Sequence, residues 1–278
     1  IQADFVWSSD QVVVACIVHP NAPYAPEERG EDHAQRLYLC EWTLDGLARA
    51  PVEIASFPAA LSEPTAPRLS ADGEVLHLVL GLNENVVSPA GAAGAPSQTI
   101  QGRVVYTTSR DGGRHWSGPE VVAASLDGVR GVDLLAGDNG VQAFFTSHGV
   151  FAASRIDGAW SLPVRVNPYA TKLLRGTDAA SHVSAAGGAS GVAIVWTDER
   201  DRASDARPSN PLGGLPWSDD SMLLANNDVF VRWFPAPHAL VVPGDEGRPL
   251  QLTTTGGFAL EPRVRMHAAD AIVLWSGV

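Results

Sequence analysis

Short runs of alternating apolar and polar residues recur along the chain between turn-forming residues, and no strong helix-length amphipathic segment interrupts them. The most regular feature is a short apolar strand that follows a polar turn. This pattern predicts an all-β repeat with loops of variable length. The repeated strands, which begin 51 to 79 residues apart, are Val12–Val18, Val75–Leu80, Val141–Thr146, Val192–Thr197 and Ala271–Trp275.

Each of these strands extends into a four-strand unit, with one strand before it and two after it, except that the last unit is incomplete. Small four-strand meanders stack radially because each sheet needs neighbours to cover both of its faces, which is the β-propeller solution. An irregular β-sandwich is the alternative. The pattern therefore predicts a single propeller domain over residues 1–278, with an open strand edge that missing residues or a second chain would complete. Its blades cover approximately residues 1–57, 65–123, 130–167 and 178–254, with a partial blade at 260–278.

Composition narrows the classes of function. The 278 residues are 45% apolar and carry a formal charge of −12, so the chain can bury a substantial core and does not suit general nucleic-acid binding. No run approaches the 18 apolar residues that a membrane span needs. The first residue is Ile1 rather than Met, which suggests a processed or truncated N-terminus. A removed export signal is the commonest cause, so we expect a secreted or periplasmic location. Residues 86–101, rich in Ala, Gly, Ser and Pro, are expected to form a mobile loop.

The two cysteines, Cys16 and Cys40, fall on neighbouring expected strands. If Val12–Val18 and Leu37–Thr43 form a hairpin centred near residue 28, the two cysteines lie opposite each other. Directly opposed residues in a non-hydrogen-bonded pair come close enough for a disulfide. We expect a disulfide, and two buried thiols are the alternative.

A sharp local signal lies between the third and fourth expected strands of the second unit. In the segment Ser109–Trp116, Asp111 can accept backbone N–H groups across the turn, Gly113 allows an unusual φ, and the Trp116 ring can pack back into the blade. The spacing of Ser109, Asp111, Gly113 and Trp116 resembles the Asp box, Ser-x-Asp-x-Gly-x-x-Trp, of sialidases and bacterial-neuraminidase repeat proteins. A shortened variant spans Ser154–Trp160, and residues 194–200 resemble a second strand of such repeats.

This resemblance implies a sialidase-like propeller of six blades, with the Asp box in a structural role on the face opposite the active site. The family pocket holds three arginines, a Tyr–Glu pair and an Asp. In this chain no Arg-Ile-Pro motif stands near the N-terminus, and none of the four tyrosines is a convincing partner for a nucleophilic pair.

Arginines stand near the starts of the innermost expected strands, the part of a propeller that lines its central channel. Converging guanidinium groups would bind a carboxylate, sulfate or phosphate. Alternatively each arginine pairs with a nearby acid: Glu63, Asp133, Asp178 and Glu261, respectively. The four candidate anion-binding residues are Arg68, Arg130, Arg175 and Arg263.

Three long loops are expected on the same face, at residues 19–36, 81–102 and 198–227, which suggests a binding surface on a rigid scaffold. The last is rich in acids, including Asp198, Glu199 and nearby Asp228. Such oxygen-rich loops can hold calcium, although solvated acids are the alternative and the usual calcium-loop spacing is absent. Asp198 and Glu261 are the carboxylates considered for an acid–base role. No zinc spacing, phosphate loop or nucleophile elbow occurs, so no cofactor is expected.

Two functions are therefore expected as alternatives. The first is an extracytoplasmic, non-catalytic propeller that binds a glycan or a protein on its loop-rich face, or that serves as a scaffold. The second is a secreted, exo-sialidase-like glycoside hydrolase that binds an anionic sugar through the arginines. A third possibility is a subunit of a larger assembly that docks through the open edge.

Overall fold

The computed structural model describes thirteen segments of the chain. They are residues 2–8, 11–18, 35–43, 46–57, 61–62, 64–88, 97–137, 140–167, 180–198, 228–235, 249–253, 259–267 and 270–277. All regular structure in these segments is β-strand, and none of it is a helix able to cross a membrane.

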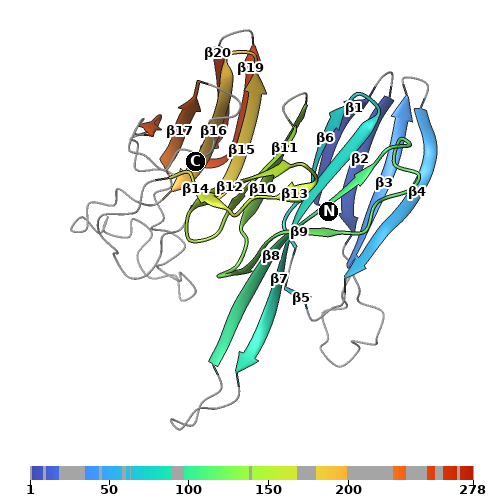
Figure 1. The fold of residues 1–278 in the computed structure, drawn as a ribbon, viewed down its shortest axis with the longest axis horizontal. Helices are drawn as coiled ribbons and strands as arrows, with labels where there is room; N and C mark the ends of the chain where they lie inside the picture. Colours follow the sequence, from blue (N-terminus) through green and yellow to red (C-terminus); the bar gives the residue numbers. More distant parts are fainter. Residues whose placement is uncertain are drawn as a thin grey trace, which may run out of the picture. The chain divides into compact units, whose positions relative to one another are not determined.

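The strands form five sheets, called A to E in chain order, and neighbouring strands run antiparallel (Figure 1). Sheet A has the order β1-β2-β3-β4, and sheet B has β5-β7-β8-β9 with β6 also paired to β7. The strands of sheet A are β1 (Gln2–Ser8), β2 (Gln11–Val18), β3 (Gln35–Thr43) and β4 (Gly46–Phe57). The strands of sheet B are β5 (Leu61–Ser62), β6 (Arg68–Asp72), β7 (Val75–Ser88), β8 (Ser97–Ser109) and β9 (Glu120–Leu126).

Sheets C and D repeat this order. Sheet C runs β10-β11-β12-β13 with β14 also paired to β12, sheet D runs β15-β16-β17-β18, and sheet E consists of β19 and β20. The strands of sheet C are β10 (Gly131–Gly137), β11 (Gly140–Thr146), β12 (Val150–Ile156), β13 (Ala159–Trp160) and β14 (Val164–Arg165). The remaining strands are β15 (Ser181–Gly188), β16 (Gly191–Asp198), β17 (Asp228–Phe234), β18 (Leu250–Gln251), β19 (Ala259–His267) and β20 (Asp270–Gly277).

These sheets confirm the predicted all-β architecture of four-stranded antiparallel units. One local prediction is wrong in part: residues 86–88 and 97–101, half of the expected loop at 86–101, form strand, and residues 89–96 lie outside the described residues. β7 continues to Ser88 and β8 starts at Ser97, and the two strands remain in register from Leu76↔Ser109 to Ser88↔Ser97. The long β7–β8 hairpin projects beyond the other strands of sheet B (Figure 1). Polar residues such as Thr99 and Gln101 remain in water on this ribbon, so it needs no covering layer.

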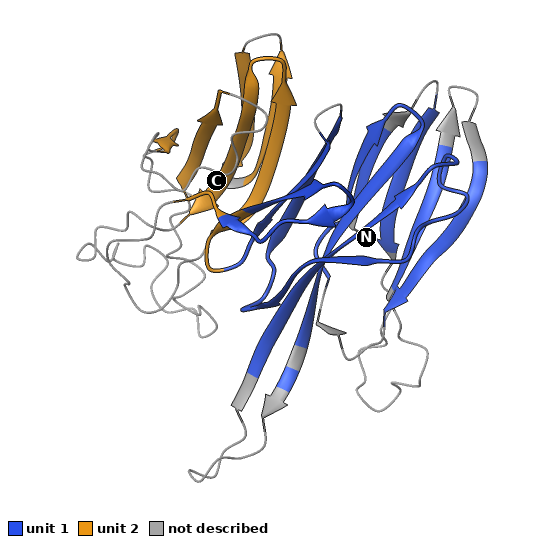
Figure 2. Ribbon diagram, in the orientation of Figure 1, with its two compact units in different colours: residues 1–147, 152–164 blue, residues 148–151, 165–278 orange. Residues whose placement is uncertain are grey.

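The chain divides into two compact units (Figure 2). Unit 1 comprises residues 1–147 and 152–164, and unit 2 comprises residues 148–151 and 165–278. The expectation of a single domain with the blade boundaries given above stays a prediction.

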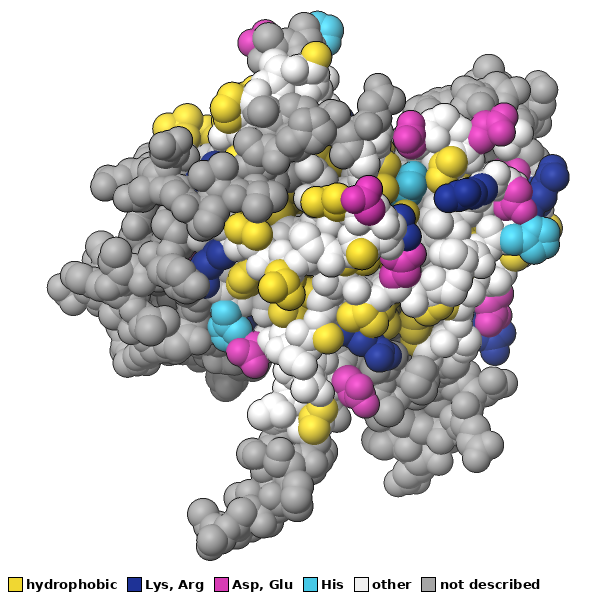
Figure 3. Space-filling view, in the orientation of Figure 1, with side chains coloured by type: hydrophobic (Ala, Val, Ile, Leu, Met, Phe, Trp, Pro, Cys, Tyr) yellow, Lys and Arg dark blue, Asp and Glu magenta, His cyan; other side chains and the backbone are white. Residues whose placement is uncertain are grey.

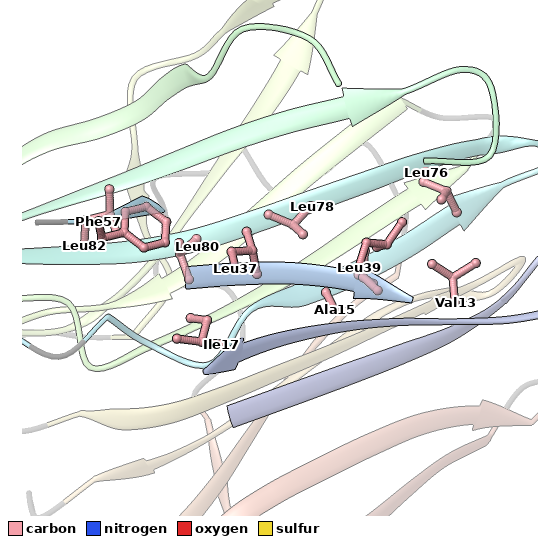
Figure 4. Close-up of a cluster of buried hydrophobic side chains, with 11 residues drawn as sticks. Val13, Ala15, Ile17, Leu37, Leu39, Phe57, Leu76, Leu78, Leu80 and Leu82 are labelled. Carbon is pink, nitrogen blue, oxygen red and sulfur yellow. The ribbon is translucent and has the colours of Figure 1, made fainter. Parts of the chain in front are cut away.

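The core of unit 1 lies between sheets A and B. Alternate residues of β2, β3 and β7 meet there, because side chains two apart on a strand face the same side of the sheet. Trp116 packs against this cluster from the turn that precedes β9. Figure 4 shows the cluster, whose buried members are Val13, Ala15, Ile17, Leu37, Leu39, Phe57, Leu69, Leu76, Leu78, Leu80 and Leu82.

The second strand of each of sheets B, C and D is buried on both faces rather than on one. All eight residues of β16 are buried, as are residues 76–82 of β7 and residues 142–146 of β11. Burial on both faces explains why these strands are almost continuously apolar, and why they dominate the repeat seen in the sequence.

Hydrogen bonds between the first strands of successive sheets recur within each unit. In each case a backbone N–H of one strand donates to a side-chain oxygen of the strand before it. The three bonds are Leu69 N to Asp4 Oδ2 at 2.8 Å, Ala136 N to Ser70 Oγ at 3.2 Å, and Val264 N to Ser184 Oγ at 3.4 Å. These bonds satisfy backbone donors of the inner strands, so they fix sheets A, B and C against one another in unit 1 and sheet D against sheet E in unit 2.

We predict that Leu78→Ala lowers the free energy of unfolding by about 2–5 kcal/mol, since it leaves a cavity in the unit 1 core. Leu162→Ala is the matched control, because Leu162 is 87% exposed whereas Leu78 is 2% exposed. Urea denaturation followed by circular dichroism measures both changes. Equal effects of the two substitutions would contradict this view of the core.

Candidate functional site

Two carboxylates face each other where β16 ends and β17 begins, in unit 2. Asp198 is the last residue of β16 and Asp228 is the first of β17, and they are direct cross-strand partners. Directly opposed residues have Cβ atoms about 4.5–5.5 Å apart. The two ends of the long expected loop at 198–227 are therefore held together as a pair of acids.

Neutral donors position this carboxylate pair. Trp196 Nε1 donates to Asp198 Oδ2 at 3.3 Å, and Asp198 is only 3% exposed. Thr253 Oγ1 donates to Asp228 Oδ1 at 2.9 Å, and Gln251 Nε2 donates to Asp228 Oδ2 at 2.9 Å. The Trp196 ring in turn stacks on Phe230, with 6.0 Å between centroids. The site is thus supported by the well-packed centre of sheet D.

The opposite face of the same sheet end carries hydroxyl and imidazole groups. Thr197 Oγ1 donates to the backbone oxygen of Ser181 at 2.8 Å and lies 2.9 Å from Ser181 Oγ. His182 Nδ1 lies 3.2 Å from Ser181 Oγ. Because consecutive strand residues point to opposite faces, Thr197 and Asp198 serve different sides of the sheet.

The predicted acid–base residue Glu261 is exposed and lies in a kink of β19. Its φ is +47°, and its equivalent in β15, His182, has a φ of +50°. The register of β15 against β16 shifts between residues 181 and 184, and that of β19 against β20 shifts between 260 and 263. β15 and β19, the first strands of sheets D and E, therefore each contain a β-bulge at the equivalent position. A β-bulge redirects a side chain at the edge of a sheet. Glu199, the predicted neighbour of Asp198, lies outside the described residues.

The four predicted arginines do not occupy equivalent positions. Arg68 pairs with Val79 and Arg263 pairs with Leu274, the same place in the first strand of sheets B and E. Arg130 is exposed, and its backbone N–H donates to Thr146 O. The equivalent bond in sheet B joins Thr65 N–H to Gly81 O. Arg130 therefore corresponds to Thr65, which lies three residues before Arg68. Arg175 lies outside the described residues. Because Arg68 and Arg130 belong to unit 1 and Arg263 to unit 2, the convergence of the arginines stays a prediction.

Arg68 is mostly buried on the inner strand of sheet B. Its Nη1 lies 4.0 Å from Asp4 Oδ1, and the side chain is 13% exposed. Glu63, the expected partner, lies outside the described residues. Among the described residues, no hydrogen-bond acceptor reaches the buried Nε and Nη1 atoms.

The Ser109–Trp116 turn folds around one carboxylate. Asp111 Oδ1 accepts backbone N–H groups of Arg114 at 3.1 Å and His115 at 2.9 Å, and Ser109 Oγ donates to the same oxygen at 2.8 Å. These bonds hold the pKa of the Asp111 carboxyl well below its usual range. Gly113 has a φ of +81°, and Trp116 Nε1 donates to its carbonyl at 3.2 Å.

This turn also ties sheet B to sheet A. Arg49 on β4 donates from Nη2 to Gly112 O at 3.3 Å and forms an ion pair with Glu41 Oε1 at 2.7 Å. A Cβ added at Gly113 would lie 2.3 Å from Leu39 Cδ2. The turn is therefore a packing element of unit 1, remote in sequence from the carboxylate pair.

A second polar cluster, which sequence reasoning missed, joins sheets B and C. Arg155 on β12 donates from Nε and Nη2 to both oxygens of Glu120 on β9, at 2.9 and 2.8 Å, and Trp160 Nε1 donates to Glu120 Oε2 at 3.1 Å. The Arg155 hydrogen bonds lower the pKa of Glu120 and raise that of Arg155. Arg155 also lies over the Tyr106 ring, 5.8 Å from its centroid. This bidentate pair is a structural clamp between neighbouring sheets.

The clamp extends inward to a buried histidine. His77 Nδ1 lies 2.7 Å from the Tyr106 hydroxyl. Burial lowers the pKa of His77; the Asp72 charge raises this pKa, and the Arg155 charge lowers it further. Burial raises the pKa of Tyr106.

The predicted disulfide is wrong in this structure, where Cys16 and Cys40 are free thiols. Cys40 lies opposite Val14, and Cys16 lies opposite Tyr38, so the two cysteines are diagonal neighbours rather than a direct pair. Burial raises the pKa of both thiols, and Cys40 Sγ donates to Val14 O at 3.8 Å. The hairpin is centred one residue earlier than predicted, because the strand alternation alone does not define the register across residues 19–34.

The described residues contain no group of three or more histidine, cysteine or acidic side chains that could hold a metal ion. Most of the acid-rich loop considered for calcium lies outside these residues. On the face shown in Figure 3, the described acidic and basic side chains are interspersed rather than segregated.

A shallow polar cavity of about 180 Å³ lies beside the β7–β8 hairpin, among Glu84, Gln101, Arg103 and Ser125. It is far along the chain from the carboxylate pair and lies in the other unit.

Comparison with known proteins identifies the fold. No family model matches the chain, and no curated protein matches it in sequence. Among solved structures, it is similar to a GH93 α-L-arabinofuranosidase of Fusarium graminearum in complex with arabinobiose, with a TM-score of 0.54 at 14% identity. That match covers 99% of this chain and 74% of the enzyme.

Two further matches have TM-scores below 0.5, and no argument rests on them. The Bacillus subtilis arabinanase Arb43A gives 0.45 at 10% identity, covering 98% of this chain and 87% of that one. A Trypanosoma rangeli sialidase gives 0.38 at 11% identity, covering 99% of this chain and 52% of that one. The match to the arabinofuranosidase, together with the antiparallel four-stranded sheets, shows that the chain is an all-β propeller with four-stranded blades.

We predict that Gly113→Ala destabilises the protein by about 2–4 kcal/mol, because it adds a clash with Leu39 to a left-handed backbone. Gly112→Ala is the control, since Gly112 has a φ of +67° but nothing within 4 Å of the added methyl group. We expect it to cost about 1 kcal/mol. Thermal and urea unfolding compare the two variants, and a smaller effect at Gly113 than at Gly112 would refute the packing role of the turn.

We also predict that the free energy of unfolding falls as the pH drops from 7 to 5, in part because of His77. The unfolded chain binds a proton as the pH falls through the ordinary histidine pKa of about 6.5, while the folded state, with a lowered pKa, does not. His77→Gln should reduce this fall relative to the unmodified protein. Urea denaturation at both pH values measures the free energy of unfolding. If His77→Gln loses as much of this free energy between pH 7 and pH 5 as the unmodified protein does, His77 is not a source of the pH dependence.

Proposed function

We propose that this chain is a carbohydrate-active propeller that hydrolyses a glycosidic bond at the Asp198–Asp228 pair. The cross-strand register of these two residues carries the proposal. Retaining glycosidases use two carboxyl groups about 5–5.5 Å apart. The pair stands at the end of a rigid sheet, next to the longest expected loop, which is where enzymes built on β-scaffolds place substrate-binding groups.

The hydrogen bonds suggest a division of roles. Asp228 accepts one hydrogen bond at each oxygen, as an ionised carboxylate does. In this proposal the Asp228 carboxylate attacks the anomeric carbon and forms a glycosyl–enzyme ester, while Asp198 protonates the glycosidic oxygen as its bond to that carbon breaks. A water molecule then attacks the same carbon, gives a proton to Asp198 and displaces the Asp228 carboxylate, which releases the sugar.

The fold is consistent with this chemistry without establishing it. The arabinofuranosidase of similar fold holds arabinobiose, a neutral sugar. An anionic sugar is the alternative substrate class, with Arg68 and Arg263 as its candidate ligands. A substrate panel therefore needs arabinofuranosides as well as sialosides and uronides.

We infer that the Ser109–Trp116 turn is an Asp box of the sialidase type with a structural role. Its support is the carboxylate-centred set of hydrogen bonds and the packing of Trp116 into the unit 1 core. This inference concerns fold relationship rather than activity.

A non-catalytic glycan- or protein-binding propeller is the second candidate. The observation that favours it is the burial of Asp198, which is 3% exposed and already hydrogen-bonded to Trp196. In that case the carboxylate pair stabilises the end of sheet D and the ligand binds elsewhere on the propeller. The extracytoplasmic location belongs to both candidates and stays a prediction.

We predict that the purified protein releases the fluorophore from at least one glycoside of the panel, and that Asp198→Asn and Asp228→Asn each reduce kcat by about 10²–10⁴-fold. Loss of an acid–base group should leave glycan binding largely intact, as measured by calorimetry with the unreacted disaccharide. Asp72→Asn is the matched control, because Asp72 is an exposed acid at the β6–β7 turn.

Two results separate the candidates. Glycan binding without turnover, unaffected by either Asn variant, favours the non-catalytic propeller. Turnover that survives both substitutions shows that the active site lies elsewhere.

A further inference from the structure

The β7–β8 hairpin has two different faces at its base. Residues directly opposite each other on paired strands lie on the same face of a sheet, and so do residues two positions apart on one strand. The register pairs Leu82 with Arg103 and Glu84 with Gln101, so these four side chains share one face. Asn83 and Gly102, the pair between them, belong to the other face.

The face of Asn83 and Gly102 is fastened to the connection between β9 and β10. Asn83 Nδ2 donates to Val129 O at 2.9 Å, and Val129 N donates to Asn83 Oδ1 at 2.6 Å. Gly102 lies so close to this connection that an added Cβ would be 2.9 Å from Gly128 C. The base of the hairpin is thus held in place, although its strands project beyond the rest of sheet B (Figure 1).

The face of Glu84 and Arg103 borders the cavity of about 180 Å³. The register of β8 against β9 shifts between Gly102 and Val104, so that Arg103 lies opposite two residues, Ala124 and Ser125. Ser125 has a φ of +56°, in the left-handed region that residues other than glycine rarely adopt. Bulges and left-handed residues of this kind cluster at functional sites, where they redirect side chains at a cost in stability.

The side chains beside the cavity carry complementary hydrogen-bonding groups. The Glu84 carboxylate accepts hydrogen bonds, the Arg103 guanidinium donates them, and the Gln101 amide does both. Within the described segments, no ion pair or hydrogen bond engages any of these three side chains. Glu84 and Arg103 are the charged residues among the described lining, so their formal charges cancel.

The volume and charge of the cavity limit what it can bind. A single water molecule needs only about 10–15 Å³ of such volume, whereas pockets for drug-sized molecules have about 300–1,000 Å³. The 180 Å³ found here therefore fits one small unit of a longer molecule. Because each hydroxyl group both donates and accepts hydrogen bonds, neighbouring hydroxyls of a sugar match a carboxylate and a guanidinium in one cavity without adding a charge.

We propose that this cavity binds one sugar unit of a neutral glycan. The Arg103 guanidinium donates hydrogen bonds to hydroxyl oxygens of the sugar, and the Glu84 carboxylate accepts hydrogen bonds from its hydroxyl groups. The cavity belongs to unit 1, whereas the Asp198–Asp228 pair belongs to unit 2, so this site is additional to that pair. Binding here does not depend on hydrolysis there.

Backbone amide shifts, followed by NMR while a ligand is titrated into the unmodified protein, locate the site directly. Arabinobiose, xylobiose and cellobiose are the neutral probes, and N-acetylneuraminic acid and inorganic phosphate are the anionic ones. At least one neutral disaccharide should shift the amides of residues 82–84, 101–103 and 124–126. The anionic probes should leave these amides unshifted at the same concentrations, because the Glu84 carboxylate repels a second negative charge.

Two substitutions test the roles of the charged side chains. Arg103→Ala and Glu84→Ala should each weaken the affinity for the bound disaccharide about tenfold or more, since each removes hydrogen bonds to a charged group. Arg114→Ala is the matched control and should leave the affinity unchanged. Arg114 is an exposed arginine in the Ser109–Trp116 turn, beyond the other end of β8.

These measurements do not involve turnover, so a failure of this proposal is distinguishable from a failure of the hydrolytic function. The proposal is overturned if no neutral disaccharide shifts the amides around the cavity, or if an anionic probe shifts them more strongly than every neutral one. Binding by Arg103→Ala that is as tight as binding by the unmodified protein would overturn it as well.

Discussion

Each sheet of this chain is too small to bury its own second strand, and the rest of the structure depends on that constraint. A sheet of four short strands is stable when other layers cover it. The second strands of sheets B, C and D are buried on both faces, as in β16, where all eight residues are buried. Within each unit the sheets must therefore pack against one another, as sheets A and B do in unit 1 and sheets D and E do in unit 2, and the repeat in the sequence follows from this requirement.

Apolar packing by itself does not fix how far one sheet slides along the next, and directional polar contacts fill that role. The side-chain oxygens of Asp4, Ser70 and Ser184 each accept a backbone N–H from the following inner strand. Charged side chains hold the outer strands of unit 1. Arg155 forms a bidentate pair with Glu120, and Arg49 donates to the Ser109–Trp116 turn. Hydrogen bonds to charged groups are stronger than neutral ones, so the outer strands of unit 1 are held more firmly than backbone pairing alone would allow.

The sequence was sufficient for the architecture and much less so for details of register. Alternation and turn residues located the four strands of sheet A, because period-two patterns depend only on local burial. The position of Cys16 relative to Cys40 depends on the connection between two strands, and the predicted pairing was displaced by two residues. The β7–β8 extension was missed because a solvated ribbon has no apolar stripe to reveal it. Asp228 was noted only as one acid among many, although adjoining strands at 192–197 and 229–234 already implied that it faces Asp198. The Glu120 clamp could not be found, because it joins residues of three separate strands.

The pairing of Asp198 with Asp228 has a consequence for how such a protein can change over evolutionary time. The 29 residues numbered 199–227 connect Asp198 to Asp228, the two members of one cross-strand pair. Because the ladder, and not the intervening segment, sets the distance between the two acids, insertions or deletions there would leave the carboxylates where they are. Lengthening a connection whose ends are already joined costs little free energy. Under the function proposed above, sequence changes in the connection would alter ligand selectivity while the carboxylate pair stays in place.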